Sequence, residues 1–248
     1  MPSRPGKLGK GKPSKPGRRI IFTPRSVVSQ MPLAFVYYFI GACLGTVAGF
    51  ALFFTFPDLL AMFIKMWVHR LTIGVQLLNG NYTLWFIVNN LVALMMVVVM
   101  SVFMFVFILR KHKVRFKSLD GMERHNPKIT LFSAYMLPIG ALLINGFLVN
   151  LFITYTLFTY GIEKTTSAVL LMVPHGVNEL VALLIATSLG LSYLKILAPM
   201  IRRKQFGKAI KTGKLLLKSK TTMLFIVLIL LLVVFSGFVE GVLTYFVL

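Results

Sequence analysis

Long apolar stretches alternate along the chain with shorter segments that carry most of the charged residues. Five such stretches are Ala34–Phe56, Thr83–Leu109, Pro138–Tyr160, Ser167–Leu191 and Thr221–Leu248. As α-helices, stretches of this length extend about 35 to 42 Å, and the hydrocarbon core of a bilayer is about 30 Å thick. A helix also satisfies its own backbone hydrogen bonds in lipid. The pattern therefore predicts an all-α membrane protein with five transmembrane helices, placed in the cell membrane.

The composition agrees with this prediction. Of the 248 residues, 57% are hydrophobic and 13% are charged, and the mean hydropathy is +0.84. A soluble domain of this size is about one quarter charged and less than half apolar. This chain has too little polar surface to cover its apolar side chains, which excludes a soluble fold. The single cysteine, Cys43, excludes an intrachain disulfide and a cysteine-rich metal site.

Lys and Arg residues are concentrated in every second segment outside the spans, although the net charge of the whole chain is +21. Eight lie in Met1–Gln30, seven in Arg110–Thr130 and nine in Ser192–Lys220, whereas Pro57–Tyr82 has two and Gly161–Thr166 has one. Positive residues are retained on the cytoplasmic side of a membrane. The distribution therefore predicts a cytoplasmic N-terminus and a C-terminus outside.

The segment Leu59–Leu78 is apolar enough to be considered as a sixth span. It carries Lys65, His69 and Arg70 near its middle, and each of these is costly at the centre of a bilayer. A sixth span would also place the two first basic segments on opposite sides. Its apolar residues recur at three- and four-residue steps, so an amphipathic helix in the outer interface is the preferred interpretation.

Residues 1–30 form a polybasic tail that contains few apolar residues and is expected to be disordered. The remainder, 31–248, is expected to be a single membrane domain with a basic cytoplasmic segment near 195–220. We expect anionic lipid at the cytoplasmic face as the partner of these basic segments. An arm that binds nucleic acid or a protein partner is the alternative. No aromatic residue stands among the charges before Phe22, so we expect no nucleic-acid partner.

Small residues recur at helical spacing in three spans, where they let another helix approach closely. They are Gly41, Gly45 and Gly49 in the first span, Ala182, Ala186 and Gly190 in the fourth, and Gly237 and Gly241 in the fifth. One interpretation is that these faces pack the bundle of a single chain. The other is that one of them forms the seam of a homo-oligomer or binds another membrane protein.

Two carboxylic acids, Glu179 and Glu240, lie inside predicted spans, where an ionised carboxylate needs a partner. His175, Asn178 and Glu179 are spaced so that they share one helix face. Asparagines in other spans can supply donors and acceptors to them. The predicted intramembrane polar cluster is His175, Asn178, Glu179, Glu240, Asn89, Asn90 and Asn145. It either fixes the helices by hydrogen bonds or lines a path for a proton, an ion or another solute.

Pro174 and Gly176 predict a break in the fourth span, because proline removes a helical hydrogen bond and clashes with the preceding turn. A third interpretation of the nearby polar residues, an intramembrane metal or hydrolytic centre, has less support. The paired-histidine zinc motif, the nucleophilic serine motif and the phosphate-binding glycine loop are all missing from the sequence. We therefore expect no enzyme, with no catalytic residue, metal or cofactor.

The sequence resembles the stage II sporulation protein M family of integral membrane proteins from about Met31 to Leu248. The residues that carry the resemblance are Pro174, His175, Gly176 and Glu179 in the pattern Pro-His-Gly-x-x-Glu, then Gly190, the pair Asn89–Asn90, the step Asn145–Gly146, and Glu240 with Thr244. Two features depart from the family pattern: Tyr245 stands where a proline is expected, and the polybasic tail is not a family feature.

The resemblance implies a five-span fold and a non-enzymatic role in assembly. The namesake is a scaffold that acts with a pair of peptidoglycan hydrolases in membrane migration during engulfment of the spore. Only the fold and the scaffolding role are carried over to this chain, because no residue points to sporulation. A transporter or channel component that uses the polar cluster as its path remains the alternative.

Overall fold

The computed structural model describes residues 22–81, 83–95, 97–98 and 127–247, and within these ranges the chain is helical with no strand. In chain order the helices are α1 (Pro24–Val28), α2 (Met31–Thr55), α3 (Pro57–Leu77), the helix Thr83–Met95, α6 (Pro127–Arg202), α7 (Phe206–Leu217) and α8 (Lys220–Val247). The predicted all-α fold is confirmed.

Four helical stretches are long and apolar enough to cross a membrane, judged by length and composition: Pro24–Thr55, Leu131–Pro174, Gly176–Arg202 and Lys220–Val242. Thr83–Met95 is a shorter apolar helix at the start of the predicted second span. The end of that span, from residue 99 to residue 109, lies outside the described residues. The chain is therefore consistent with a multi-pass membrane protein.

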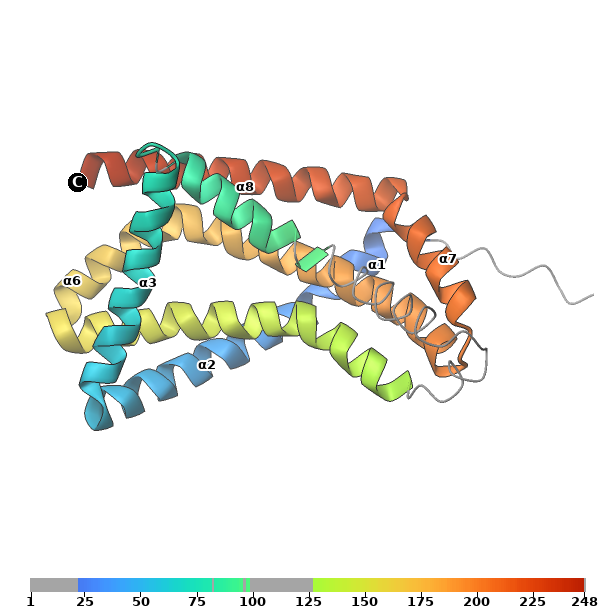
Figure 1. Ribbon diagram of the computed structural model, residues 1–248, viewed down its shortest axis with the longest axis horizontal. Coiled ribbons are helices and arrows are strands. Elements are labelled where there is room, and N and C mark those ends of the chain that lie inside the picture. Colours follow the sequence, from blue (N-terminus) through green and yellow to red (C-terminus); the bar gives the residue numbers. More distant parts are fainter. Residues whose placement is uncertain (1–21, 82, 96, 99–126, 248) are drawn as a thin grey trace, which may run out of the picture.

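The helix α6 is a hairpin rather than a single rod, and it turns at Gly161 (Figure 1). This residue has φ 83° and ψ 175°, a conformation that is essentially restricted to glycine. The predicted break at Pro174 and Gly176 is wrong, because both residues lie within the helical second arm. An internal proline removes one backbone hydrogen bond, and a packed apolar helix can continue through that loss.

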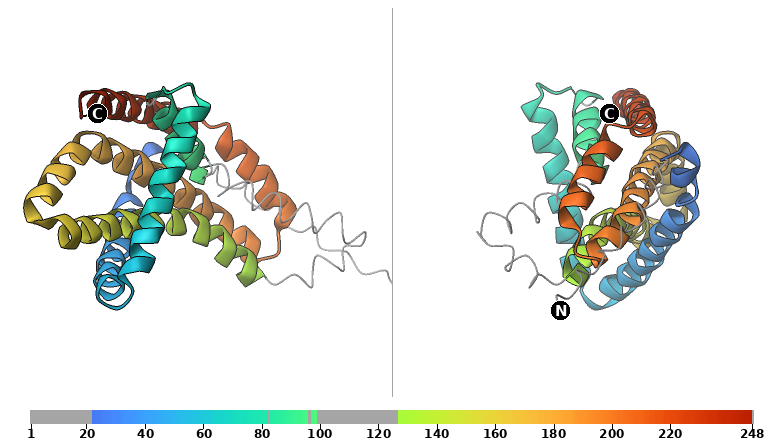
Figure 2. Two further views of the ribbon diagram at one scale, coloured as in Figure 1. Left: turned by 60° about the vertical axis from the view of Figure 1, so that its left-hand side comes forward. Right: turned by 90° about the vertical axis from the view of Figure 1, so that its right-hand side faces the viewer.

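The long helices run side by side along the longest dimension of the molecule, and α3 crosses them at the end where α6 turns (Figures 1 and 2). The opposite end gathers α1, α7, both ends of α6 and the start of α8 (Figure 1). Successive long helices therefore begin at alternating ends of the bundle.

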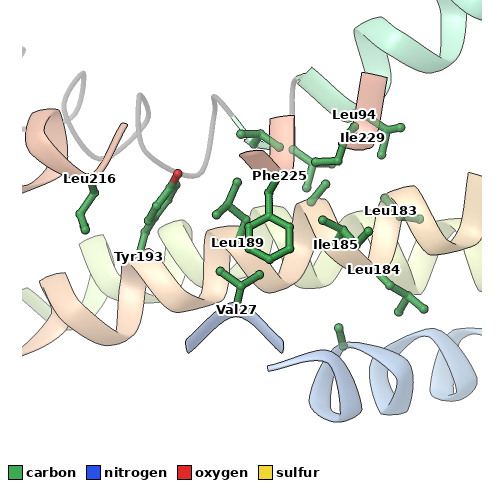
Figure 3. Close-up of a cluster of buried hydrophobic side chains, with 14 of the residues drawn as sticks. Val27, Leu94, Leu183, Leu184, Ile185, Leu189, Tyr193, Leu216, Phe225 and Ile229 are labelled. Atoms are coloured by element: carbon green, nitrogen blue, oxygen red, sulfur yellow. The ribbon is translucent and has the colours of Figure 1, made fainter. Parts of the chain in front are cut away.

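The second arm of α6 is the centre of the bundle. Every residue from Ala182 to Leu194 is buried there, because α1, α2 and α8 all pack against this helix. Figure 3 shows Leu189 and Ile185 on this arm between Val27 on one side and Phe225 on the other. The core therefore depends on apolar packing around one central helix, as expected when close packing replaces the hydrophobic effect in lipid.

The folded domain begins before residue 31, so the predicted boundary of the disordered tail at residue 30 is wrong. Val27 in α1 is fully buried, and the backbone oxygen of Ser26 accepts a hydrogen bond from Ser192 Oγ at 2.9 Å. Phe22 packs beside the ring of Tyr193, with 5.4 Å between ring centroids. These apolar contacts order the segment, although basic residues precede it. Residues 1–21 lie outside the described residues.

Candidate functional site

The side chain of Glu179 connects three helices. Its carboxylate accepts a hydrogen bond from Asn90 Nδ2 on the helix Thr83–Met95 and a second one from Ser236 on α8. Asn89 donates to Asn90 Oδ1 at 3.3 Å, which orients the amide that faces the carboxylate. Hydrogen bonds to a charged group are stronger than those between neutral groups. Glu179 therefore ties the second arm of α6 to two neighbouring helices.

Glu240 is the second carboxylic acid of this site. It follows Ser236 by one helical turn on α8, so both side chains point to the same side of that helix. Its carboxyl group lies close enough to Glu179 for an electrostatic interaction between them. Two ionised carboxylates repel each other strongly away from water. A bound cation would relieve that repulsion.

The remaining residues of the predicted cluster lie in different surroundings. Asn178 is half-buried, and its Nδ2 donates to the backbone oxygen of Pro174 at 2.8 Å, so this bond lies within its own helix. Asn145 is exposed and lies at the wall of a cavity. The side chain of His175 lies outside the described part of the structure.

Ser236 also belongs to the cluster, although it was not predicted from the sequence. Ser236 is fully buried, although a serine inside an apolar stretch is common and gives little signal by itself. Its spacing of four residues before Glu240 was the available indication, because positions four apart share a helix face. The cluster that the structure brings together thus consists of Glu179, Glu240, Asn89, Asn90 and Ser236.

A cavity of about 240 Å³ lies beside this cluster, between α2 and the two arms of α6. Its polar lining comes from Tyr38 on α2, Asn145 on the first arm and Glu179 on the second arm. Of the residues that the structure describes, the other lining residues are apolar apart from Gly176, and none of them is Lys or Arg. The cavity therefore combines a mainly apolar wall with a carboxylate and two neutral polar groups, a combination typical of small-molecule sites.

The glycine face of α2 packs against the first arm of α6. A Cβ atom at Gly45 would lie 2.8 Å from the backbone carbonyl carbon of Phe147, and one at Gly49 would lie 2.8 Å from Thr154 Cβ. Gly41 faces the backbone of Leu143 in the same way, and Gly146 on α6 faces the backbone of α2. The two backbones can approach this closely only because side chains are absent.

The other small-residue faces are also covered by the chain itself. Gly237 faces the backbone of Ile87 and Gly241 faces Thr83, so α8 packs closely on the helix Thr83–Met95. Ala182, Ala186 and Gly190 are buried in the central arm of α6. None of these faces can join a second chain unless the bundle opens.

No group of three or more His, Cys, Asp and Glu residues that could hold a metal ion is found among the described residues. Comparison of the chain with family models, with curated proteins and with solved structures finds no match. The resemblance to the stage II sporulation protein M family stays a prediction that depends on the sequence motifs.

Proposed function

We propose that the chain is a five-span membrane protein with its N-terminus in the cytoplasm and its C-terminus outside. The alternating direction of the long helices supports this topology, and so does the distribution of charge. The end that carries α7 presents many exposed basic side chains, among them Arg202, Lys208, Lys211, Lys214 and Lys218. The turn of α6 carries one acid and one base, Glu163 and Lys164. The basic end fits the cytoplasmic face.

The helices α3 and α7 are the proposed interfacial elements of this topology. α3 runs across the long helices near the turn of α6 (Figure 1), as a helix in the plane of the outer interface would. α7 buries Phe206, Ala209 and Leu216 against the bundle and exposes lysines on its other side. This arrangement suits contact with anionic lipid headgroups, where each Lys near the surface contributes about 1 kcal/mol.

The function that the site supports best is a non-enzymatic scaffold for other membrane components. One observation carries this proposal: the carboxylate of Glu179 is held by donors from two other helices, Asn90 and Ser236. An intramembrane charge is costly, and here hydrogen bonds join it to the frame of the bundle. The polar residues then fix the relative positions of the helices, as the resemblance to a scaffold family also implies.

Partners of such a scaffold would dock on its exposed apolar surface. The small-residue faces are occupied within the chain, whereas α2 and α8 expose large side chains. Those that are exposed by more than half include Phe39, Val47 and Phe54 on α2, and Leu231, Phe235 and Phe238 on α8. Another membrane protein or a second copy could cover these faces in the plane of the bilayer, where lipid covers them otherwise.

The experiment that tests the scaffold is purification of the full chain in nanodiscs from its own membrane, followed by mass measurement and identification of bound proteins. A reproducible complex with other membrane proteins, or a defined homo-oligomer, is expected. The complex should survive in Glu179→Gln, because an uncharged amide of the same shape keeps the packing. A monomer that carries only lipid would contradict the scaffold.

A transport component is the second candidate, and the cavity beside Glu179 is the observation that favours it. In that case Glu179 and Glu240 would bind and release a proton or a cation in turn. Glu179→Gln separates the two functions. Loss of proton or solute flux in vesicles by a folded and assembled variant supports transport, whereas unchanged activity of that variant supports the scaffold.

A further inference from the structure

Gly176 lines the cavity beside Glu179 and keeps part of it open. A Cβ atom built at Gly176 would meet no other atom within 4 Å, whereas one at Gly45 would collide with the backbone of α6. Close helix packing therefore explains Gly45 but does not explain Gly176. A glycine inside a helix is less favourable than alanine by about 0.5–1 kcal/mol. A side chain at position 176 would project into this space, which the glycine leaves free.

The wall of the cavity has a defined chemical character. Valines at 169, 173 and 177 are four residues apart along the second arm of α6 and form one apolar side. Among the lining side chains that the structure describes, Glu179 alone carries a formal charge, and Asn145 and Tyr38 supply neutral polar atoms. A carboxylate has about four lone-pair sites. The bonds from Asn90 and Ser236 use two of them, which leaves acceptor capacity for a ligand.

We propose that this cavity binds an amphipathic organic amine in its protonated form. The ammonium group donates to the Glu179 carboxylate and to the side-chain oxygen of Asn145, while the apolar body lies against the valines. A volume of about 240 Å³ exceeds the roughly 150 Å³ of an apolar cavity that binds benzene, which suits an amine of about ten non-hydrogen atoms. The proposal requires the membrane fold but neither the scaffold nor the transport function.

Other ligand classes fit this wall less well. An anionic lipid headgroup would face Glu179, and the described part of the wall offers no Lys or Arg to balance its charge. A hard cation such as Ca²⁺ takes six to eight oxygen ligands, and one carboxylate, one amide and one phenol supply too few. A neutral amphiphile would fill the apolar part but would leave the carboxylate without a counter-charge.

The test uses the full chain in nanodiscs of phosphatidylcholine and the probe 2-naphthylmethylamine at pH 7, with binding measured by equilibrium dialysis. Empty nanodiscs report partition into lipid. The uncharged alcohol 2-naphthylmethanol serves as the analogue of the same shape. The expected result is saturable binding of about one amine per chain, at least tenfold tighter than binding of the alcohol. Absence of saturable amine binding by the folded protein would overturn the proposal.

Two matched variants locate the site. Gly176→Leu should weaken amine binding at least tenfold, because its side chain projects from the cavity wall. Gly140→Leu is the control: Gly140 is also a glycine of α6 whose Cβ would meet nothing within 4 Å, but it is not a lining residue of this cavity. The Gly140→Leu variant should bind the amine as tightly as the unchanged chain does. Equal binding by both variants, or an equal loss in both, would overturn the proposed location.

Two further variants test the recognition of charge. Glu179→Gln should remove the preference for the amine over the alcohol while leaving binding of the alcohol unchanged. Asn145→Leu gives a second readout if Glu179→Gln does not fold, because Asn145 is exposed and lies apart from the Asn90 hydrogen bond. It should weaken amine binding severalfold. A preference for the amine that persists in both variants would contradict recognition by these groups.

Discussion

Asn90 donates a hydrogen bond from its side chain to the carboxylate of Glu179, a residue 89 positions later in the chain and on a different helix. Replacement of Asn90 by leucine should remove this donor from a half-buried carboxylate. The expected loss is about 1–3 kcal/mol of unfolding free energy, the usual cost of leaving one buried polar group without a partner. Reversible unfolding in mixed micelles measures this loss.

The control for that prediction is Asn178→Leu. The side chain of Asn178 is half-buried, and its Nδ2 donates to the backbone oxygen of Pro174 in the same helix at 2.8 Å. Because this bond joins no second helix, replacement of Asn178 should change the unfolding free energy by only about 0.5 kcal/mol, less than the loss in Asn90→Leu. An equal loss in both variants would mean that the bond between Asn90 and Glu179 does not tie the helices together.

Gly45 tests the close contact between α2 and the first arm of α6. In Gly45→Ala the new Cβ would lie 2.8 Å from the carbonyl carbon of Phe147, and a backbone atom cannot swing aside. The two helices must separate, which should cost about 1–3 kcal/mol, the range for overpacking of a close contact. Thermal unfolding followed by circular dichroism in detergent measures the effect.

Gly140→Ala is the matched control for Gly45→Ala. A Cβ at Gly140 has open space around it, so the same chemical change meets no neighbour. Alanine is the better helix former by about 0.5–1 kcal/mol, and stability should stay the same or rise slightly. A fall in stability at Gly140 that matches the fall at Gly45 would show that general helix effects, and not the approach of the two backbones, explain both results.

The sequence was sufficient to predict the apolar helices but not the place where α6 turns. Length and hydropathy define a span. The helices α2 and α8 therefore begin and end within three residues of the predicted spans 34–56 and 221–248. Pro174 was the more conspicuous helix breaker, yet the chain turns at Gly161. A proline removes one hydrogen bond and can stay within a packed helix, whereas the non-helical φ and ψ of Gly161 end one helical arm and let the chain turn into the next.

Part of the polar cluster could also be predicted, because an intramembrane Glu needs donors and Asn is a natural one. Glu179, Glu240 and Asn90 were predicted in one cluster and do lie together, whereas Asn178 bonds within its own helix and Ser236 was not predicted. The reason is that the long helices are apolar on every side. Sequence periodicity then leaves the rotation of each helix undetermined, and tertiary packing decides which polar side chains meet.

Gly161 and Pro174 give a paired prediction about the hairpin. Gly161→Ala should destabilise the protein by about 1–3 kcal/mol, because φ 83° with ψ 175° is strained for any residue with a side chain. Pro174→Ala should leave stability unchanged or increase it, since alanine restores a backbone donor within a continuous helix. Proteolysis of the purified protein in detergent compares the two. A large loss of stability in Pro174→Ala and none in Gly161→Ala would mean that the fold depends on the backbone at Pro174 and not on the turn at Gly161.

The proposed topology predicts the sides of the membrane on which the two ends of the bundle lie. In a Cys43→Ser background, a single cysteine at Glu163, which is exposed at the turn of α6, should react with a membrane-impermeant maleimide in intact cells. A single cysteine at Lys211, which is exposed on α7, should react only after the membrane is permeabilised. The reason is that retention of basic segments fixes the α7 end in the cytoplasm.

The unchanged chain is the control, because Cys43 lies near the middle of α2 and should stay unlabelled in both conditions. Labelling of both introduced cysteines from outside would exclude a bilayer between the two ends, and with it a crossing of the membrane by the second arm of α6.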